Sequence, residues 1–258
     1  MNHIGSFIVP CHSSSHHRIA LVVVAHPDDA SFNHAIARHS TAALESLGYT
    51  THLCDLYADN FDPVITKGEV RGQRTEDELT KQYIGLLASA EVLVVVHPNC
   101  WGAPPAMMKG WMDRVFAEGS AYAFAKSTDQ GDAPIGLLRA KTAIVFNTSN
   151  TEEGRERVEF GDPLERIWKD CLLRYCGVQR TIRRVFRIIA TSSAGHREAW
   201  LREVHSTIVD AIHNVTRCLV PAFDGAYFSR EWKEALWARF YTGAPPRRRR
   251  SVERYNIV

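Results

Sequence analysis

The apolar run Val92-Leu93-Val94-Val95-Val96 leads into His97-Pro98-Asn99-Cys100-Trp101-Gly102-Ala103-Pro104-Pro105-Ala106-Met107-Met108-Lys109-Gly110-Trp111, and this stretch decides the fold class. Such a continuous apolar run is typical of a strand buried on both faces of a parallel sheet. An aromatic residue, small residues and a proline pair follow it before a helical pattern begins. Open α/β sheets bind ligands at the carboxyl ends of their strands, so this loop is a candidate site for a flat ring.

Strand patterns alternate with helical patterns on both sides of this stretch. Strands are predicted at residues 19–25, 50–56, 91–96, 141–146 and 180–189, and helices at 33–47, 76–88, 105–116, 163–175 and 198–215. Strands joined by right-handed helical crossovers form a doubly wound parallel sheet with helices on both faces. Residues 117–138 fall outside this rhythm and are predicted to form a long loop, of the kind that often serves as a lid or an interface.

The composition is that of an ordinary globular protein. A chain of 258 residues with 45% hydrophobic and 23% charged residues suffices for one large α/β domain with extensions. A net charge of +2 favours no acidic partner. No apolar stretch approaches the roughly 20 residues that cross a bilayer. The six cysteines include no Cys-x-x-Cys pair, so reduced thiols in a cytoplasmic protein are expected.

Three segments are predicted along the chain. Residues 1–17 are rich in Ser and His and are expected to form a disordered leader, because they lack the pattern of a secretory signal. Residues 18–220 carry the alternating pattern. Residues 221–258 are expected to form a helical extension with a basic tail at Arg247 to Arg250. Because the whole chain is nearly neutral, this tail predicts at most weak contact with a membrane surface and no nucleic-acid partner.

A polar turn, Ala25-His26-Pro27-Asp28-Asp29-Ala30-Ser31-Phe32-Asn33, follows the first predicted strand and leads into a helix. The free N–H groups and the dipole of a helix N-terminus attract anions. Ser31 and Asn33 add side-chain donors for a phosphate, and His26 could pair with one. The same residues also fit an ordinary helix N-cap, so this motif alone does not decide between the two interpretations.

Four segments, in order and with fitting spacing, resemble the NAD(P)H:quinone oxidoreductase family of flavodoxin-like flavoproteins. They are His26-Pro27 with Ser31-Phe32-Asn33; Asp55-Leu56-Tyr57 with Phe61-Asp62-Pro63; Pro98, Trp101-Gly102 and Pro105-Ala106 with the helix up to Phe116; and Ala121-Tyr122. The resemblance covers the chain from Arg18 to the last long helix. It implies a flavodoxin-like three-layer doubly wound sandwich whose five-stranded parallel sheet has the order 2-1-3-4-5.

The resemblance also implies a flavin, FAD or alternatively FMN, across the ends of the first, third and fourth strands. The phosphate and ribityl end would be held by His26, Ser31, Phe32 and Asn33. The isoalloxazine ring would be bordered by Pro98, Asn99, Cys100, Trp101 and Gly102. The loop after the fourth strand would offer backbone donors from Asn147, Thr148, Ser149 and Asn150. NADH or NADPH would supply electrons for a quinone-like or other small acceptor, and the family forms homodimers.

The sequence departs from the family pattern near the acceptor. Ser149-Asn150 stand where the best-known quinone reductases have two glycines, and Phe160 stands where they have a histidine. No catalytic side chain is therefore assigned. A non-catalytic subunit that senses flavin or nucleotide is the alternative function.

A second resemblance is confined to Ala25-His26-Pro27-Asp28-Asp29, which is similar to the zinc loop of the N-acetylglucosaminyl deacetylases. A catalytic zinc needs three protein ligands and one open position. Ala30 stands where that family has a glutamate, and the chain contains no His-x-x-His to supply the third ligand. No metal site is predicted, and the deacetylase stays a remote alternative.

Overall fold

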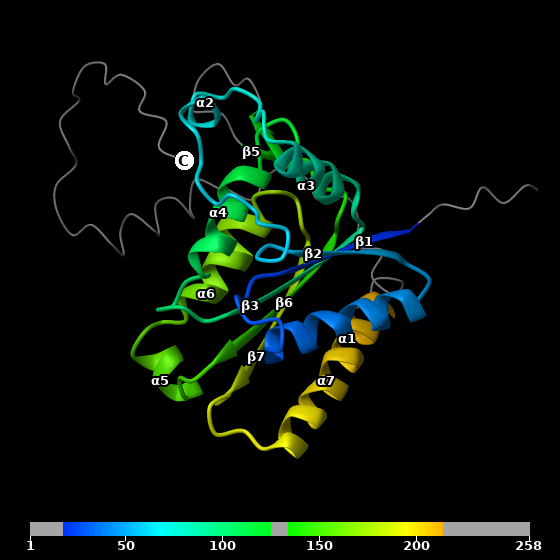
Figure 1. Cartoon of the computed structure of the whole chain (residues 1–258), viewed down its shortest axis with the longest axis vertical. Helices are drawn as coiled ribbons and strands as arrows, with labels where there is room; N and C mark the ends of the chain where they lie inside the picture. Colours follow the sequence, from blue (N-terminus) through cyan, green and yellow to red (C-terminus); the bar gives the residue numbers. More distant parts are fainter. Residues whose placement is uncertain (1–17, 125–133, 214–258) are drawn as a thin grey trace, which may run out of the picture.

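The computed structural model describes residues 18–124 and 134–213 (Figure 1). The predicted leader at 1–17 lies outside these residues, as does the predicted extension at 221–258 with Arg247 to Arg250. Residues 125–133 of the predicted long loop also lie outside them.

A five-stranded sheet forms the centre of the described chain. Its strands are β1 (Ile19–Val24), β2 (Thr50–Asp55), β3 (Val92–Pro98), β6 (Thr142–Ser149) and β7 (Arg180–Arg187). They pair in the order β2-β1-β3-β6-β7, and every pair is parallel. Numbered by their appearance in this sheet, the order is 2-1-3-4-5, so the predicted flavodoxin-like topology is confirmed.

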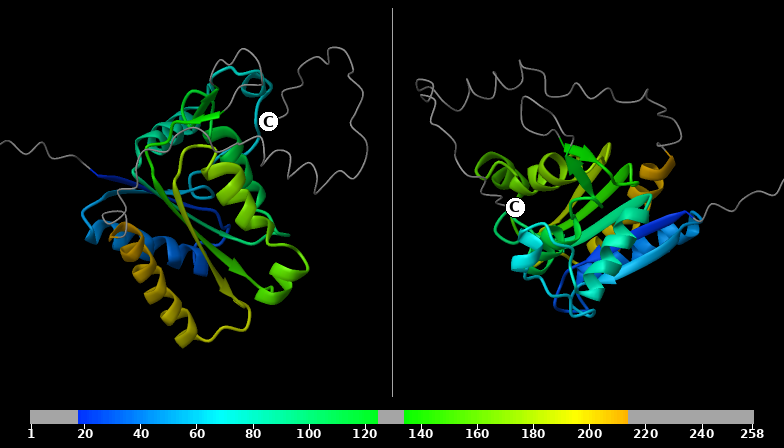
Figure 2. Two further views of the ribbon diagram at one scale, coloured as in Figure 1. Left: turned by 180° about the vertical axis from the view of Figure 1, so that it is seen from behind. Right: turned by 90° about the horizontal axis from the view of Figure 1, so that it is seen from above.

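Helices cover both faces of the sheet (Figures 1 and 2). One face carries α1 (Phe32–Ser46) and α7 (Ala194–His213), and the other carries α3 (Glu78–Ser89), α4 (Ala106–Val115), α6 (Pro163–Glu165) and the π-helix η1 (Arg166–Leu173). Successive strand residues point to opposite faces, so Leu21 and Val23 pack toward α3 and α4 while Val22 and Val24 pack toward α1 and α7. Burial on both faces explains the continuous apolar runs of the sequence.

Several short elements escaped the sequence analysis. They are α2 (Lys67–Val70), α5 (Glu153–Val158) and an antiparallel pair, β4 (Tyr122–Phe124) with β5 (Pro134–Gly136). Residues 117–138 are therefore not an unbroken loop. The helix predicted at 163–175 is present, as the short α6 followed by the π-helix η1, which ends at Leu173. Within that π-helix the Trp168 indole donates a hydrogen bond to His97, a long-range contact that hydrophobic periodicity does not reveal.

The parallel arrangement gathers the carboxyl ends of β1, β3 and β6 at one edge of the sheet, which is where open α/β sheets bind ligands.

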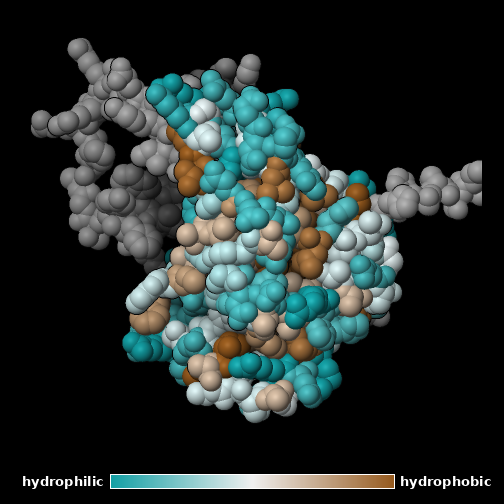
Figure 3. All heavy atoms as spheres, viewed as in Figure 1, coloured by the Kyte–Doolittle hydropathy of each residue, from teal (hydrophilic) through white to brown (hydrophobic). Residues whose placement is uncertain are grey.

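No helix among the described residues is long and apolar enough to cross a membrane. On the face shown in Figure 3, brown patches are small and separated by teal and white atoms. The loops at the carboxyl edge of the sheet are therefore the natural place to look for a functional site.

Candidate functional site

The β1–α1 loop (residues 25–31) is fastened to the end of β2 by side-chain hydrogen bonds. Ser31 caps α1, since its Oγ accepts the N–H of His34 at 3.3 Å. The same Oγ lies 2.9 Å from Nδ1 of His34, whose Nε2 lies 2.8 Å from Oδ2 of Asp55. The Asp55 carboxylate also accepts the N–H groups of Tyr57 and Ala58. The capping serine is thus held by a chain of contacts that reaches a second strand.

The other predicted residues of this loop have different surroundings. His26 accepts the N–H of Asp28 at Nδ1, 3.1 Å away. The ring of Phe32 packs toward α7, with its centroid 5.8 Å from that of Trp200. Asn33 is buried, and its amide donates to the Thr148 hydroxyl at 3.1 Å. Since Asn33 is engaged in this way, the donors left for an anion are the first N–H groups of α1, which have no partner within the helix.

The β3–α4 loop (residues 99–105) is shaped by Asn99, which follows Pro98, the last residue of β3. The Asn99 side chain accepts the N–H of Gly102 at 2.8 Å and donates to Glu156 of α5 at 2.9 Å. Cys100 and Ala103 pair through their backbones, and Trp101 and Gly102 between them have φ angles of 58° and 76°. Trp101 is fully exposed as a result. Burial raises the pKa of the Cys100 thiol, so this group stays protonated at neutral pH.

The prediction that Asn147, Thr148 and Ser149 lie in a loop is wrong. They are the last residues of β6, and all three are buried. Their side chains have partners inside the protein: the Asn147 amide oxygen, for example, accepts from Nε of Arg183 at 2.7 Å. Of the four predicted residues only Asn150 lies beyond the strand, where its side chain accepts the N–H of Ala190 at 2.9 Å.

His97 is a buried residue of this region that the sequence analysis passed over. Its Nε2 accepts the indole N–H of Trp168 at 2.9 Å, and its Nδ1 lies 2.8 Å from the carbonyl oxygen of Pro98. Burial lowers the pKa of His97 to about 4, so the ring is neutral at neutral pH. The sequence offered only a histidine at the end of a strand. Its partner Trp168 lies 71 residues away and could not be assigned to it.

A buried ionic cluster supports the β6–α5 loop (residues 150–152). Arg183 of β7, with a side chain only 4% exposed, lies 2.8 Å from Asp162 and 3.6 Å from Glu156. Arg187 lies 3.2 Å from the other oxygen of Glu156. Because Glu156 also accepts from Asn99, the cluster joins β7 and α5 to the β3–α4 loop. Phe160, which stands where the family has a histidine, is half exposed beneath the guanidinium of Arg155.

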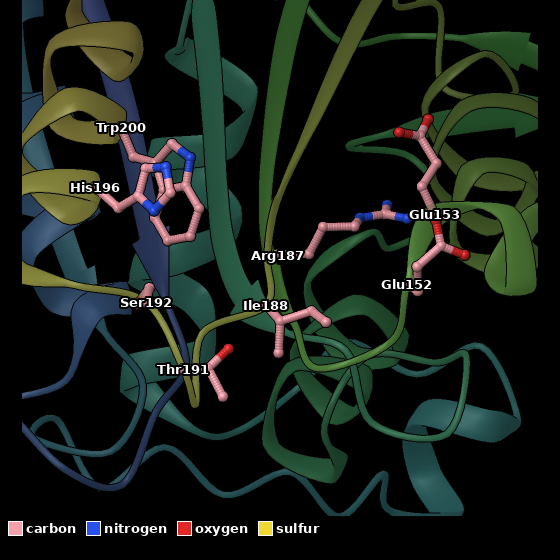
Figure 4. A pocket seen from close by; sticks show the side chains of 8 residues that line it. All are labelled: Glu152, Glu153, Arg187, Ile188, Thr191, Ser192, His196 and Trp200. Atoms are coloured by element: carbon pink, nitrogen blue, oxygen red, sulfur yellow. The ribbon is translucent and has the colours of Figure 1, made fainter.

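A pocket of about 550 Å³ opens beside this cluster (Figure 4). It is lined by Glu152, Glu153, Arg187, Ile188, Thr191, Ser192, His196 and Trp200. The rings of His196 and Trp200 stack with centroids 5.7 Å apart and form one wall, while Arg187, Ile188 and the two glutamates stand across from it. Trp200 also contacts Phe32, so this pocket adjoins the start of α1.

Within residues 18–124 and 134–213, no group of three His, Cys, Asp or Glu side chains lies close enough to hold a metal ion. Four cysteines of these residues, Cys54, Cys100, Cys171 and Cys176, are free thiols. The chemistry of this edge is therefore that of hydrogen-bond donors, an aromatic wall and a helix N-terminus.

Comparison with known proteins identifies the family. A family model described as a flavodoxin-like fold matches residues 19–208. The chain is 29% identical to rat NAD(P)H dehydrogenase (quinone) 1 over 183 aligned residues. The alignment covers 63% of this chain and 66% of the rat protein. An uncharacterised NAD(P)H oxidoreductase of Haemophilus influenzae is 30% identical, over 62% of this chain and 78% of its own. The chain belongs to the NAD(P)H:quinone oxidoreductase family of flavodoxin-like proteins.

A solved structure agrees with the fold. A Streptococcus mutans UA159 protein superposes with a TM-score of 0.64 at 28% identity, over 74% of this chain and 98% of its own. The family therefore extends over nearly all of the residues that the structure describes.

The residues at the sheet edge fit the flavin that the family implies. The unpartnered N–H groups at the start of α1 suit a phosphate. Gly102 lies so close to Pro163 that an added Cβ would come within 2.7 Å of the proline ring, so only glycine lets the β3–α4 loop pack against Pro163 at this point. The His196–Trp200 wall suits a second flat ring. Ser31, Phe32 and Trp200 are thus compatible with a bound flavin.

Proposed function

We propose that this protein is a flavin-dependent NAD(P)H oxidoreductase that passes two electrons to a quinone-like or other small acceptor. The observation that carries the proposal is the meeting of the β1–α1 and β3–α4 loops at the carboxyl edge of the sheet in a member of this family. A bound flavin would supply the hydride chemistry, taking hydride from the nicotinamide and delivering it to the acceptor.

In this proposal the protein binds and orients the flavin, and solvent supplies the protons that the reduced acceptor takes up. Ser31 and the first N–H groups of α1 hold the phosphate end, with His26 beside them. The ring lies against residues 98–102, where Asn99 fixes the turn through its bonds to Gly102 and Glu156. His97 is neutral and fully buried, with its Nε2 engaged by Trp168, so it is not an acid for the acceptor.

We propose FAD rather than FMN as the cofactor. FMN ends at its phosphate, whereas FAD continues into an adenosine that needs a site of its own. The pocket walled by His196 and Trp200 adjoins Phe32, so it is suited to an adenine ring that extends from a diphosphate at the start of α1. Stacking on an aromatic wall contributes about 0.5–1.5 kcal/mol beyond burial.

The cofactor proposal is tested by Trp200→Ala. Flavin released by heat from the native protein should chromatograph as FAD. The variant should bind FAD about 2- to 10-fold more weakly, which corresponds to the stacking energy, and should bind FMN unchanged. Equal weakening for both flavins would show that Trp200 acts only on the fold, and FMN released from the native protein would overturn the assignment.

The activity is tested by steady-state turnover of the flavin-loaded protein with NADH or NADPH and menadione. Oxidation of the nicotinamide that depends on both flavin and menadione supports the enzyme. Tight flavin binding without turnover, for menadione and for an azo dye alike, would favour the regulatory subunit instead. We also propose that the protein is a homodimer, since Trp101, Val158 and Phe160 are exposed near the site, and light scattering on the purified protein tests this assembly. A cytoplasmic location stays a proposal from the sequence, based on its cysteines, which include no Cys-x-x-Cys pair.

A further inference from the structure

A hydrogen-bonded chain of three side chains lies beneath the N-terminus of α1, and neither His34 nor Asp55 has a role in the function proposed above. Ser31 Oγ lies 2.9 Å from His34 Nδ1, and His34 Nε2 lies 2.8 Å from Asp55 Oδ2. The side chain of His34 is 8% exposed and that of Asp55 is 21% exposed. These contacts are therefore made largely away from water.

When His34 is neutral, the chemistry of the three groups fixes the direction of each hydrogen bond. A carboxylate only accepts, so His34 donates from Nε2 to Asp55. In a neutral imidazole the other nitrogen carries no hydrogen, so His34 Nδ1 accepts the hydroxyl hydrogen of Ser31. The Ser31 oxygen meanwhile accepts the N–H of His34 at the start of the helix. With His34 neutral, the single hydrogen of Ser31 points into the protein and is not available to an anion.

Adding a proton to His34 reverses the second bond. Nδ1 then donates to Ser31 Oγ, and the hydroxyl hydrogen is free to turn outward toward the helix N-terminus. The new positive charge lies between the Asp55 carboxylate and that helix end. A helix N-terminus by itself disfavours a cation, whereas an anion bound there favours one. The protonated form of His34 is thus the form that suits an occupied anion site.

We propose that binding of the cofactor diphosphate is coupled to the uptake of one proton by His34, which converts Ser31 into a donor to the diphosphate. His34 and Asp55 are then positioning residues that act through Ser31. This inference rests on the proposed function, because it requires a flavin diphosphate at the N-terminus of α1. It implies that FAD binds more tightly as the pH is lowered, because the flavin-bound protein holds one more proton than the flavin-free protein.

Other charged groups near His34 could contribute to such a pH dependence. From β2 the group is Asp55 itself, and from the β1–α1 loop it is His26, whose ring centroid lies 6.3 Å from that of His34. Asp28 and Asp29 of that loop are exposed, and Arg38 one turn along α1 reaches the carbonyl of Asp29. Helix α7 packs against another side of α1, where Phe32 meets Trp200. His26 is therefore the group that an experiment has to separate from His34.

The test is calorimetric titration of the flavin-free full-length protein with FAD at about pH 7. FAD is the right probe because its diphosphate lacks the terminal phosphate ionisation near pH 6 that FMN carries. Repeating the titration in two buffers with different ionisation enthalpies gives the number of protons taken up. We expect a clear net uptake, and a Kd that falls by at most about tenfold per pH unit as the pH is lowered, because one proton is taken up.

Two variants locate the proton. In His34→Gln the amide can still donate to Asp55 but takes up no proton, so uptake should vanish and the Kd should no longer depend on pH. The matched control, His26→Gln, should retain the uptake. Asp55→Asn serves as a second variant: its loss of the carboxylate should reduce the uptake at about pH 7 even if His34→Gln folds poorly. Thermal unfolding of each flavin-free variant checks that it is folded.

The outcomes are distinguishable. No proton uptake by the native protein, or unchanged uptake in His34→Gln, would overturn the coupling while leaving flavin binding intact. Uptake lost only in His26→Gln would assign the proton to His26 and likewise overturn it. If the native protein binds neither FAD nor FMN at any pH, the proposed function fails, and the coupling fails with it.

Discussion

The two loops that flank the carboxyl edge of the sheet are held in different ways. The β1–α1 loop is held by the contacts of Ser31 with His34, whose ring lies against a single carboxylate, Asp55. The β6–α5 loop is supported by the ionic cluster in which Arg183 and Arg187 share Glu156. The charges in that cluster are buried and lie 3.2–3.6 Å from one another. If the proposed coupling holds, the first loop is the one that responds to a ligand, because His34 takes up a proton there.

The largest effect is expected from breaking the ionic cluster with Glu156→Ala. Removing one partner of a buried ion pair typically costs about 3–5 kcal/mol, because the other charge is left buried and uncompensated. Urea unfolding measures this loss. The matched control is Glu153→Ala on the same helix, whose exposed pair with Arg157 should contribute less than about 0.5 kcal/mol. Similar losses in the two variants would show that the cluster is not a rigid support.

The pH dependence of stability provides the second test, through His97. Its pKa falls from 6.5 to about 4 in the folded protein because it is buried, so the unfolded chain binds more protons between these values. The folded state should therefore lose stability as the pH falls from 6.5 to about 4, by roughly 3 kcal/mol in total. Urea unfolding of His97→Gln, whose amide can still accept from Trp168, should show a flatter pH profile. An unchanged profile would mean that other groups cause the loss.

The third test concerns the hydrogen bonds between α1, which follows the β1–α1 loop, and β6, which precedes the β6–α5 loop. Asn33 of α1 and Thr148 of β6 exchange hydrogen bonds of 3.1 and 3.2 Å in a buried place. Thr148→Val keeps the side-chain shape but leaves the Asn33 amide without this partner, which should cost about 1–3 kcal/mol. Thr50→Val on the exposed part of β2 is the control and should change the free energy of unfolding by less than about 0.5 kcal/mol. Equal effects would mean that water satisfies the Asn33 amide.

The fold was predictable because its signals are local and repeated. Apolar runs such as Val92 to Val96 and the helical patterns between them locate the strands to within a few residues, and right-handed crossovers leave few topologies. The resemblance around Trp101 and Ser31 supplied the strand order. Short elements such as α2, a capped single turn at Lys67–Val70, carry too little pattern to be recognised.

The candidate site was predicted less completely, because its contacts join distant residues. From the sequence alone, Asn147 is interpreted as a polar loop residue. In the structure it lies inside β6, where its side-chain oxygen accepts a hydrogen bond from Arg183, 36 residues away. His34 reads as a residue of the helix surface until Asp55 on β2 is brought beside it. The signal that could have found this pair was present: a histidine three residues after a capping serine, and an aspartate at the end of the neighbouring strand. Its meaning depends on β2 lying next to β1.

The smallest effect on stability is expected at Trp101, which lies in a third loop, the β3–α4 loop, outside the two regions compared above. Its side chain is fully exposed, so Trp101→Ala leaves no cavity and should change the free energy of unfolding by less than about 0.5 kcal/mol. The φ of 58° is equally unfavourable for Trp and Ala, so the backbone adds no difference. If Trp101 borders the flavin ring, the same change should weaken flavin binding about 2- to 10-fold.

Fluorescence titration with the cofactor measures that change, and Phe124→Ala is its matched control. Phe124 is another exposed aromatic side chain, on β4 and outside the strand-end loops. Its removal should leave flavin affinity unchanged. Because neither side chain is part of the core, a loss of affinity confined to Trp101→Ala reports a contact made only when the ligand is present. An equal flavin affinity in both variants would show that Trp101 does not contact the cofactor. If Trp101→Ala then shifts the protein to monomers in light scattering, Trp101 belongs to the subunit interface.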